Sequence, residues 1–192
     1  MTIFEHVSVF VSIVLGLAVV HLLGGLSLIL DARVRTKVYW IHLAWTAGLL
    51  LLTVLVWLGS FALAPVREFG AAHVFNLVAY AMVIYLMSGL LFPVRGEEVT
   101  DFREHFHANR TRFFSLGVLF VATDAIDGLL EWRAAGLPLD VGQFGTLAVW
   151  LVVFVIGIRS SSDRFHAFAV LAFLVGLGGF LVSLIDTGIL SG

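Results

Sequence analysis

Residues 7–37, VSVFVSIVLGLAVVHLLGGLSLILDARVRTK, set the pattern of the chain: a long apolar run without a charged residue, followed by a short connection rich in arginine and lysine. A helix needs about 20 apolar residues to cross the hydrocarbon core of a bilayer. The same alternation recurs along the chain and predicts six spans, at 3–30, 38–63, 72–94, 113–130, 141–158 and 165–190. Because an unpaired backbone polar group is unfavourable in hydrocarbon, we expect every span to be a helix.

The composition is typical of a membrane protein: 60% of the residues are hydrophobic, 12% are charged, and the mean hydropathy is +1.06. Soluble globular domains carry about 25% charged residues. Six spans in 192 residues leave room only for short connections, so we expect a single transmembrane domain, 1–192. The first span lacks the basic leader and cleavage site of a secretory signal, and we expect it to be retained. The absence of cysteine excludes disulfides, iron–sulfur ligation and covalently attached haem.

The basic residues are distributed unevenly between the connections. Only Arg67 and Arg133 lie in the second and fourth connections. The other nine of the eleven lie in the first, third and fifth connections: Arg33, Arg35, Lys37, Arg95, Arg103, Arg110, Arg112, Arg159 and Arg164. The positive-inside rule places these three connections in the cytoplasm and both termini outside. We therefore expect an integral protein of the plasma (inner) membrane in this orientation.

The longest connection, 95–112, carries both signs of charge (RGEEVTDFREHFHANRTR). Two interpretations are open. The segment forms either a short interfacial helix, with Phe102, Phe106 and the arginine stems toward lipid, or a solvated loop. In both cases we expect it to link the two halves of the chain on the cytoplasmic side.

The two halves, 1–94 and 113–192, show a weak internal similarity. A shift of 93 positions pairs Trp57 with Trp150 and His73 with His166, whereas the first and fourth spans need a different shift. A true duplication and chance agreement between apolar segments are both open. Three spans per unit would invert the second copy, the arrangement around which many transporters form a midplane site.

Small residues at helical spacing indicate where helices approach one another closely. We expect such contacts at Ser8, Ser12, Gly16 and Gly25 in the first span and at Ala172 and Gly176 in the sixth. The spacing leaves open whether these faces join helices within one chain or between subunits. We expect a homo-oligomer in the lipid bilayer.

Carboxylates inside the fourth span are the strongest indication of function. Asp124, Asp127 and Glu131 are spaced three and four positions apart, which places all three on one helix face. A charged side chain near the bilayer centre costs at least about 2.5–3.5 kcal/mol. No lysine or arginine in the predicted spans is present to neutralise them. We therefore interpret Asp124 and Asp127 as proton or cation sites, with Glu131 closer to the outside.

Other polar side chains would extend this pathway. His73, Asn76 and Asp186 fall in the outer third of their spans, and His21 lies deeper. Carboxylates and imidazoles are the usual components of a proton relay or a hard-cation path. We expect His21 to act as an inner relay and His73 with Asp186 as outer partners. A purely structural role at helix ends or at the interface is the alternative for Glu131, His73 and Asp186.

The same side chains suggest two cofactor sites. His73, Asp127 and Asp186 form a weak candidate site for zinc or manganese. A b-type haem needs two axial imidazoles at matched depth on neighbouring helices. The candidate pairs are His21 with His42 or His166, and His6 with His73.

Enzymatic function finds little support in the sequence. The chain has no G-x-S-x-G, P-loop or G-x-G-x-x-G motif. The serines at 160–162 precede Asp163 and lie near His166, but in a short turn where Ser162 or Asp163 is expected to cap the sixth helix. The basic connections are short and interleaved with acids, which does not indicate nucleic-acid binding.

The sequence thus predicts an all-α membrane protein of six transmembrane helices that moves protons or small cations. Two other classes are open: a haem b cytochrome, and a non-conducting assembly or sensor subunit.

Overall fold

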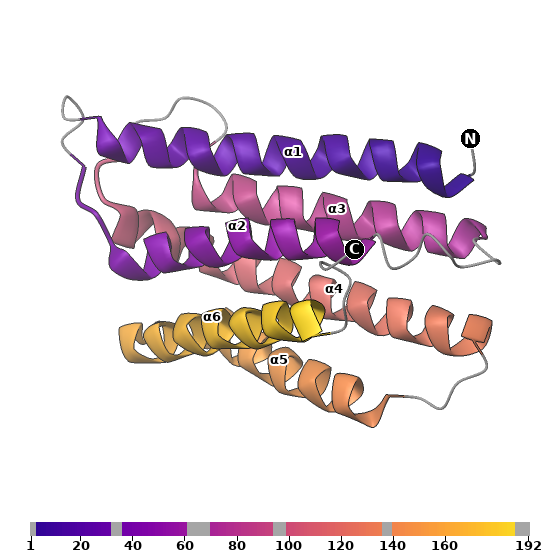
Figure 1. The fold of residues 1–192 in the computed structure, drawn as a ribbon. Helices are drawn as coiled ribbons and strands as arrows, with labels where there is room; N and C mark the ends of the chain where they lie inside the picture. Colours follow the sequence, from indigo (N-terminus) through magenta and orange to yellow (C-terminus); the bar gives the residue numbers. More distant parts are fainter. Residues whose placement is uncertain (1–2, 32–35, 61–69, 94–98, 136–139, 187–192) are drawn as a thin grey trace.

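The computed structural model describes residues 3–31, 36–60, 70–93, 99–135 and 140–186 (Figure 1). Within these residues the chain forms six α-helices, each long and apolar enough to cross a membrane. They are α1 (Ile3–Leu30), α2 (Trp40–Ser60), α3 (Ala71–Leu91), α4 (Phe102–Ala135), α5 (Val141–Arg159) and α6 (Asp163–Asp186). The protein is therefore an all-α, six-span membrane protein, as the sequence predicts.

Consecutive helices run in opposite directions, so the connections alternate between two ends of the bundle (Figure 1). We call the end with Lys37, Arg103 and Arg159 the basic end, and the end with Glu131 and Asp140 the acidic end. The predicted orientation, in which the basic end is cytoplasmic, remains a prediction.

Helix α4 begins earlier than the sequence suggests. Residues 102–112, expected to form a loop or a lipid-facing interfacial helix, are instead the first turns of α4. Phe102 and Phe106 are 5% and 2% exposed, so both rings lie in the core of the bundle and not toward lipid. Burying two aromatic rings four positions apart on one face stabilises this segment as a helix despite its many charges.

The start of α4 is capped by Asp101. Its Oδ1 accepts hydrogen bonds from the backbone N–H of Arg103 at 2.9 Å and of Glu104 at 3.3 Å. The Glu104 amide, together with that of Arg103, holds the pKa of the Asp101 carboxyl below its usual value. The carboxylate therefore remains ionised and satisfies two of the free amides of the first helical turn.

The segments that precede α2 and α4 pair with each other at the basic end. The backbone N–H of Lys37 donates to the Thr100 oxygen, and the N–H of Phe102 donates to the Lys37 oxygen, both at 3.0 Å. The two segments form an isolated parallel bridge between Lys37 and Asp101. This pairing holds the starts of α2 and α4 side by side.

The helices pack unevenly. The most extensive contacts join α1 to α3, α3 to α4, and α4 to α5, and α2 packs mainly on α6 (Figure 1). Helices at corresponding positions in the two halves therefore pair differently, because the first helix packs on the third in one half and on the second in the other. The internal duplication remains a prediction.

Trp45 lies at the centre of the core. It is 1% exposed, and its ring centroid is 5.3 Å from that of Phe113, 5.6 Å from Phe114 and 5.2 Å from Phe173. These rings join α2, α4 and α6. Aromatic pairs at such separations contribute stability beyond the area they bury.

At three glycines, the missing side chain lets an aromatic ring from a neighbouring part of the chain approach the helix backbone closely. A Cβ atom added at Gly25 would lie 2.2 Å from Cγ of Phe92, and one added at Gly157 would lie 2.6 Å from Cδ1 of Phe114. Gly117 faces the ring of Phe154 in the same way, at 3.0 Å. The α1–α3 and α4–α5 contacts therefore depend on the missing side chains of these glycines.

The other predicted packing residues have varied surroundings. Ser8 and Ala172 are half-buried, and Gly16 and Gly176 are exposed. Ser12 accepts a hydrogen bond of 3.1 Å from Nε1 of Trp57 on α2. Gly16 has open space around it, whereas Gly176 lies within ordinary contact of Trp150. The side of α1 that packs inside the bundle is formed by Val11, Leu15, Ala18, Leu22 and Gly25.

Candidate functional site

A cavity of about 620 Å³ lies within the bundle, lined by residues from α2 to α6. Its lining includes the carboxylates of Asp124, Asp127 and Glu131 on α4 and of Asp140 at the start of α5, and includes no lysine or arginine among the described residues. We call it the acidic cavity. It occupies the half of the bundle toward the acidic end, because it is lined by the later turns of α2, α4 and α6. Glu131 and Asp140 are exposed at that end.

The two deeper carboxylates accept hydrogen bonds from α3. The Tyr80 hydroxyl donates to Oδ1 of Asp124 at 2.9 Å, and Nδ2 of Asn76 donates to Oδ1 of Asp127 at 3.2 Å. Both donors are neutral. They satisfy one oxygen of each acid but bring no positive charge to compensate a negative charge on the pair.

The three carboxylates of α4 are spaced in a row along the cavity. From Asp124 to Glu131 the helix rises about 10 Å, or two turns. Between them, Gly128 faces Gln143 of α5, whose Oε1 would be 2.9 Å from an added Cβ. The absence of a side chain at Gly128 lets the Gln143 amide approach α4, and Gln143 also lines the cavity.

Tyr80 and Gln143 were not predicted from the sequence as site residues. For Tyr80 a signal was present: His73, Asn76 and Tyr80 are spaced three and four positions apart and so share one face of α3. That face meets the acidic face of α4. For Gln143 no local pattern pointed to the site, because its position depends on the contact with Gly128.

Of the predicted pathway residues, Asp124, Asp127 and Glu131 line the acidic cavity, and Asn76 bonds to Asp127. His73 is buried on α3 and lies near enough to Asp127 for the two groups to interact electrostatically. The side chain of Asp186, the last residue of α6, lies outside the part of the molecule that the structure describes.

His21 does not line the acidic cavity and instead helps to cap the end of α3. The last carbonyls of a helix have no partner within it, and a buried carbonyl without a partner is unfavourable. Three histidines from three helices supply donors: Nε2 of His21, His42 and His105 lies 3.0, 2.8 and 3.2 Å from the oxygens of Phe92, Leu91 and Leu90. These carbonyls lie at the basic end, away from the acidic cavity.

These hydrogen bonds involve histidines that were also predicted to bind haem. Nε2 of His166 lies 2.9 Å from the Ser160 oxygen at the end of α5, so His21, His42 and His166 all use Nε2 to cap helices and do not present it to a haem iron. Of the remaining pair, His6 is exposed and His73 is buried. Among the described residues, no three His, Asp or Glu side chains are placed to hold a metal ion.

A second polar cluster joins α4, α6 and the segment before α2 at the basic end. Asp163, at the start of α6, accepts a hydrogen bond from the Tyr39 hydroxyl at 3.0 Å and from Nε and Nη2 of Arg103 at 3.0 and 2.9 Å. Nε2 of His107 lies 2.9 Å from the same carboxylate. Burial, together with the bond to Asp163, raises the pKa of the Tyr39 phenol, which therefore remains a donor at neutral pH. As expected, Ser162 caps α6, with the N–H of Phe165 at 3.5 Å from its Oγ.

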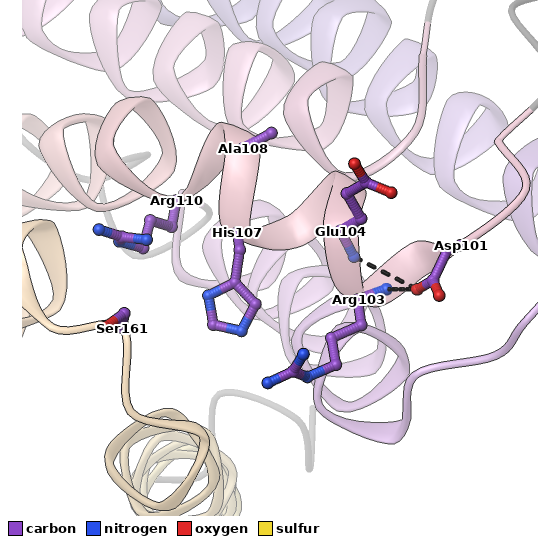
Figure 2. A pocket seen from close by; sticks show the side chains of 7 residues that line it. All are labelled: Asp101, Arg103, Glu104, His107, Ala108, Arg110 and Ser161. Atoms are coloured by element: carbon purple, nitrogen blue, oxygen red, sulfur yellow. Dashed lines mark hydrogen bonds between the residues drawn. The ribbon is translucent and has the colours of Figure 1, made fainter.

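Beside this cluster is a cavity of about 600 Å³, lined by both acidic and basic side chains. Figure 2 shows Arg103, His107 and Arg110 projecting from α4, with Ser161 facing them from the turn before α6. Asp101 and Glu104 line the same space, so its charges are mixed and favour no ligand charge.

Replacing Asp163 with asparagine is expected to lower the free energy of unfolding by about 1 kcal/mol. Although the carboxylate joins three segments, its side chain is 41% exposed and that of Arg103 is 58% exposed, so water screens the pair. The measurement is a denaturant titration in lipid nanodiscs at low and high salt. The difference from the unchanged protein should shrink in 1 M salt, where screening acts over about 3 Å. A loss that did not depend on salt would contradict the electrostatic origin.

No protein-family model, no curated protein and no solved structure matches the chain. The membrane class follows from the six helices themselves. The assignment of a function therefore rests on the geometry of the acidic cavity.

Proposed function

We propose that the protein binds protons or small cations in the acidic cavity and carries them across the membrane. The observation that supports this most is the position of Asp124 and Asp127, which line a cavity inside the bundle and accept hydrogen bonds only from the neutral groups of Tyr80 and Asn76 among the described residues. Carboxylates in such a place need a proton, water or a bound cation. The described lining contains no Lys or Arg, so a bound proton or cation, in addition to His73 beside Asp127, can supply the compensating charge.

The row of carboxylates on α4 provides a route into the cavity. The exposed Glu131 and Asp140 raise the local concentration of cations at the acidic end, since clefts lined by one sign of charge attract the opposite sign. From Glu131 a proton or cation then passes one helical turn to Asp127 and a further turn to Asp124. Under the predicted orientation this route leads inward from outside the cell.

Aromatic rings pack together at the inner end of the cavity. Trp150, Phe154 and Phe173 line it there, with ring centroids of Trp150 5.9 Å from Phe154 and 5.4 Å from Phe173. Behind Phe173 lies Trp45. Packed rings at the inner end favour a carrier that changes conformation for each cation over a continuously open pore.

The test is cation flux into proteoliposomes that contain the full chain, driven by a proton or sodium gradient. We expect Asp124→Asn to lower the flux by about tenfold or more, because it removes a charged contact of about 1.5–3 kcal/mol and every 1.4 kcal/mol is tenfold in affinity. Asparagine keeps the shape and can still accept the Tyr80 hydrogen bond.

The matched control is Glu104→Gln, which removes one negative charge from an exposed position at the basic end of α4, away from the acidic cavity. Its flux should equal that of the unchanged protein. Equal flux in Asp124→Asn and in the unchanged protein would refute the role of Asp124. No flux in the unchanged protein would instead favour an assembly or sensor subunit.

A further inference from the structure

The acidic cavity is much larger than a proton or a metal ion requires. Its volume is about 620 Å³. A water molecule occupies about 30 Å³ of liquid, and sites for small organic molecules measure about 300–1,000 Å³. The cavity is therefore the size of a small-molecule site.

The lining of the cavity has two chemically distinct parts. α4 contributes three of the four carboxylates, and α5 and α6 contribute mainly apolar and aromatic side chains. The largest of these are Trp150, Phe154, Phe173 and Phe180. A ligand that satisfies both parts carries a positive charge at one place and an apolar body elsewhere.

Aromatic rings also stand beside the deepest acid. The ring of Tyr80, whose hydroxyl bonds to Asp124, meets Phe120 edge to face at a centroid distance of 4.7 Å, and both residues line the cavity. The faces of aromatic rings attract organic cations, most strongly when water is excluded. An ammonium group near Asp124 would thus contact a carboxylate and aromatic rings together.

The mostly apolar lining favours organic cations over strongly hydrated inorganic ions. Moving a strongly hydrated inorganic ion into an apolar environment is very unfavourable unless protein oxygens replace its water. Among the described residues no three His, Asp or Glu side chains form such a shell. An amine with an apolar body is more weakly hydrated and gains contacts with the apolar lining.

From these observations we infer that the acidic cavity binds a monovalent organic cation, an amine or quaternary ammonium compound with an apolar body. The positive group pairs with Asp124 beside Tyr80 and Phe120, and the body packs on Trp150 and Phe173. This inference rests on the proposed function, because it names the class of cation that the same site takes up.

The probe for the test is benzyltrimethylammonium, with neopentylbenzene as its uncharged isostere. Binding is measured by titration calorimetry on the full chain in nanodiscs, with empty nanodiscs subtracted. We expect saturable binding of one probe per chain and none of the isostere. Asp124→Asn should weaken binding by at least about tenfold. Trp150→Leu should weaken it by about two- to twelvefold, the range of an aromatic contact with the body of the probe.

The matched control is Trp132→Leu, which alters a tryptophan on α4 that is 42% exposed and does not line the cavity. Its affinity for the probe should equal that of the unchanged protein. A second measurement needs no variant: sodium in hundredfold excess should leave the probe bound. Displacement by sodium at comparable concentration, or equal binding of the isostere, would overturn the inference.

The flux assay separates this inference from the proposed function. Proton or sodium flux that depends on Asp124, without binding of the probe, would overturn the organic-cation inference and leave the proposed function standing. Saturable, Asp124-dependent binding without flux of protons, sodium or the probe would support the site and its ligand class and contradict transport.

Discussion

Replacing Trp45 with alanine is expected to lower the free energy of unfolding by about 3–5 kcal/mol, as truncation of a buried aromatic ring does in well-packed cores. Trp45 is 1% exposed and contacts rings on α4 and α6. In a bilayer the transfer of apolar surface contributes little, since lipid is as apolar as the core, and the loss comes from broken van der Waals contacts around the new cavity.

The measurement is a denaturant titration of the full chain in nanodiscs, with Trp132→Ala as the matched control. Trp132 is 42% exposed on α4, so its loss removes few internal contacts and should change stability little. Trp45→Phe should fall between the two, because it keeps most of the ring and removes an indole N–H that has no hydrogen-bond partner among the described residues. Equal stability of Trp45→Ala and Trp132→Ala would show that the aromatic core is not well packed.

Replacing Gly25 with alanine is expected to destabilise the protein by about 1–3 kcal/mol, the usual range for overpacking. The added methyl group would lie 2.2 Å from Cγ of Phe92, whose ring is 3% exposed, so the ring can move aside only by changing rotamer inside the core or by shifting the end of α3. The same shift would disturb the bond between His21 and the Phe92 oxygen. Helix propensity alone would favour alanine over glycine by up to about 1 kcal/mol, so the steric effect must exceed this gain.

Gly24→Ala is the matched control, because a Cβ atom at this neighbouring position meets nothing within 4 Å. We expect its stability to be unchanged or slightly increased. The two variants are compared by thermal unfolding in the same nanodiscs. If Gly25→Ala is as stable as Gly24→Ala, the close contact between α1 and Phe92 does not contribute to the fold.

The number and type of elements were predictable from the sequence because crossing a bilayer imposes a strong local requirement. A run of about 20 apolar residues can meet that requirement only as a helix. The same local logic placed Asp124, Asp127 and Glu131 on one face of α4. It failed at residues 102–112, where the charges masked the spacing of Phe102 and Phe106 and where burial against other helices decided the outcome.

The roles of the histidines were beyond the sequence. His21, His42 and His105 lie far apart in the chain, and only the packing of α1, α2 and α4 around the end of α3 brings them to its last carbonyls. A local pattern cannot reveal such a cap. The cap supplies hydrogen-bond partners to buried carbonyl oxygens of α3, a helix that carries none of these three histidines.

By itself, the sequence determined that the chain is a six-helix membrane protein with an acidic face on the fourth helix, because hydrophobic length and helical periodicity are local properties. Only the tertiary structure decided what that face meets: Tyr80 and Asn76 on α3, Gln143 on α5, and an aromatic inner end formed by Trp150, Phe154 and Phe173. The reason is that a cavity is defined by side chains from several helices at once. Its volume and the separation of its charged and aromatic parts depend on how those helices pack.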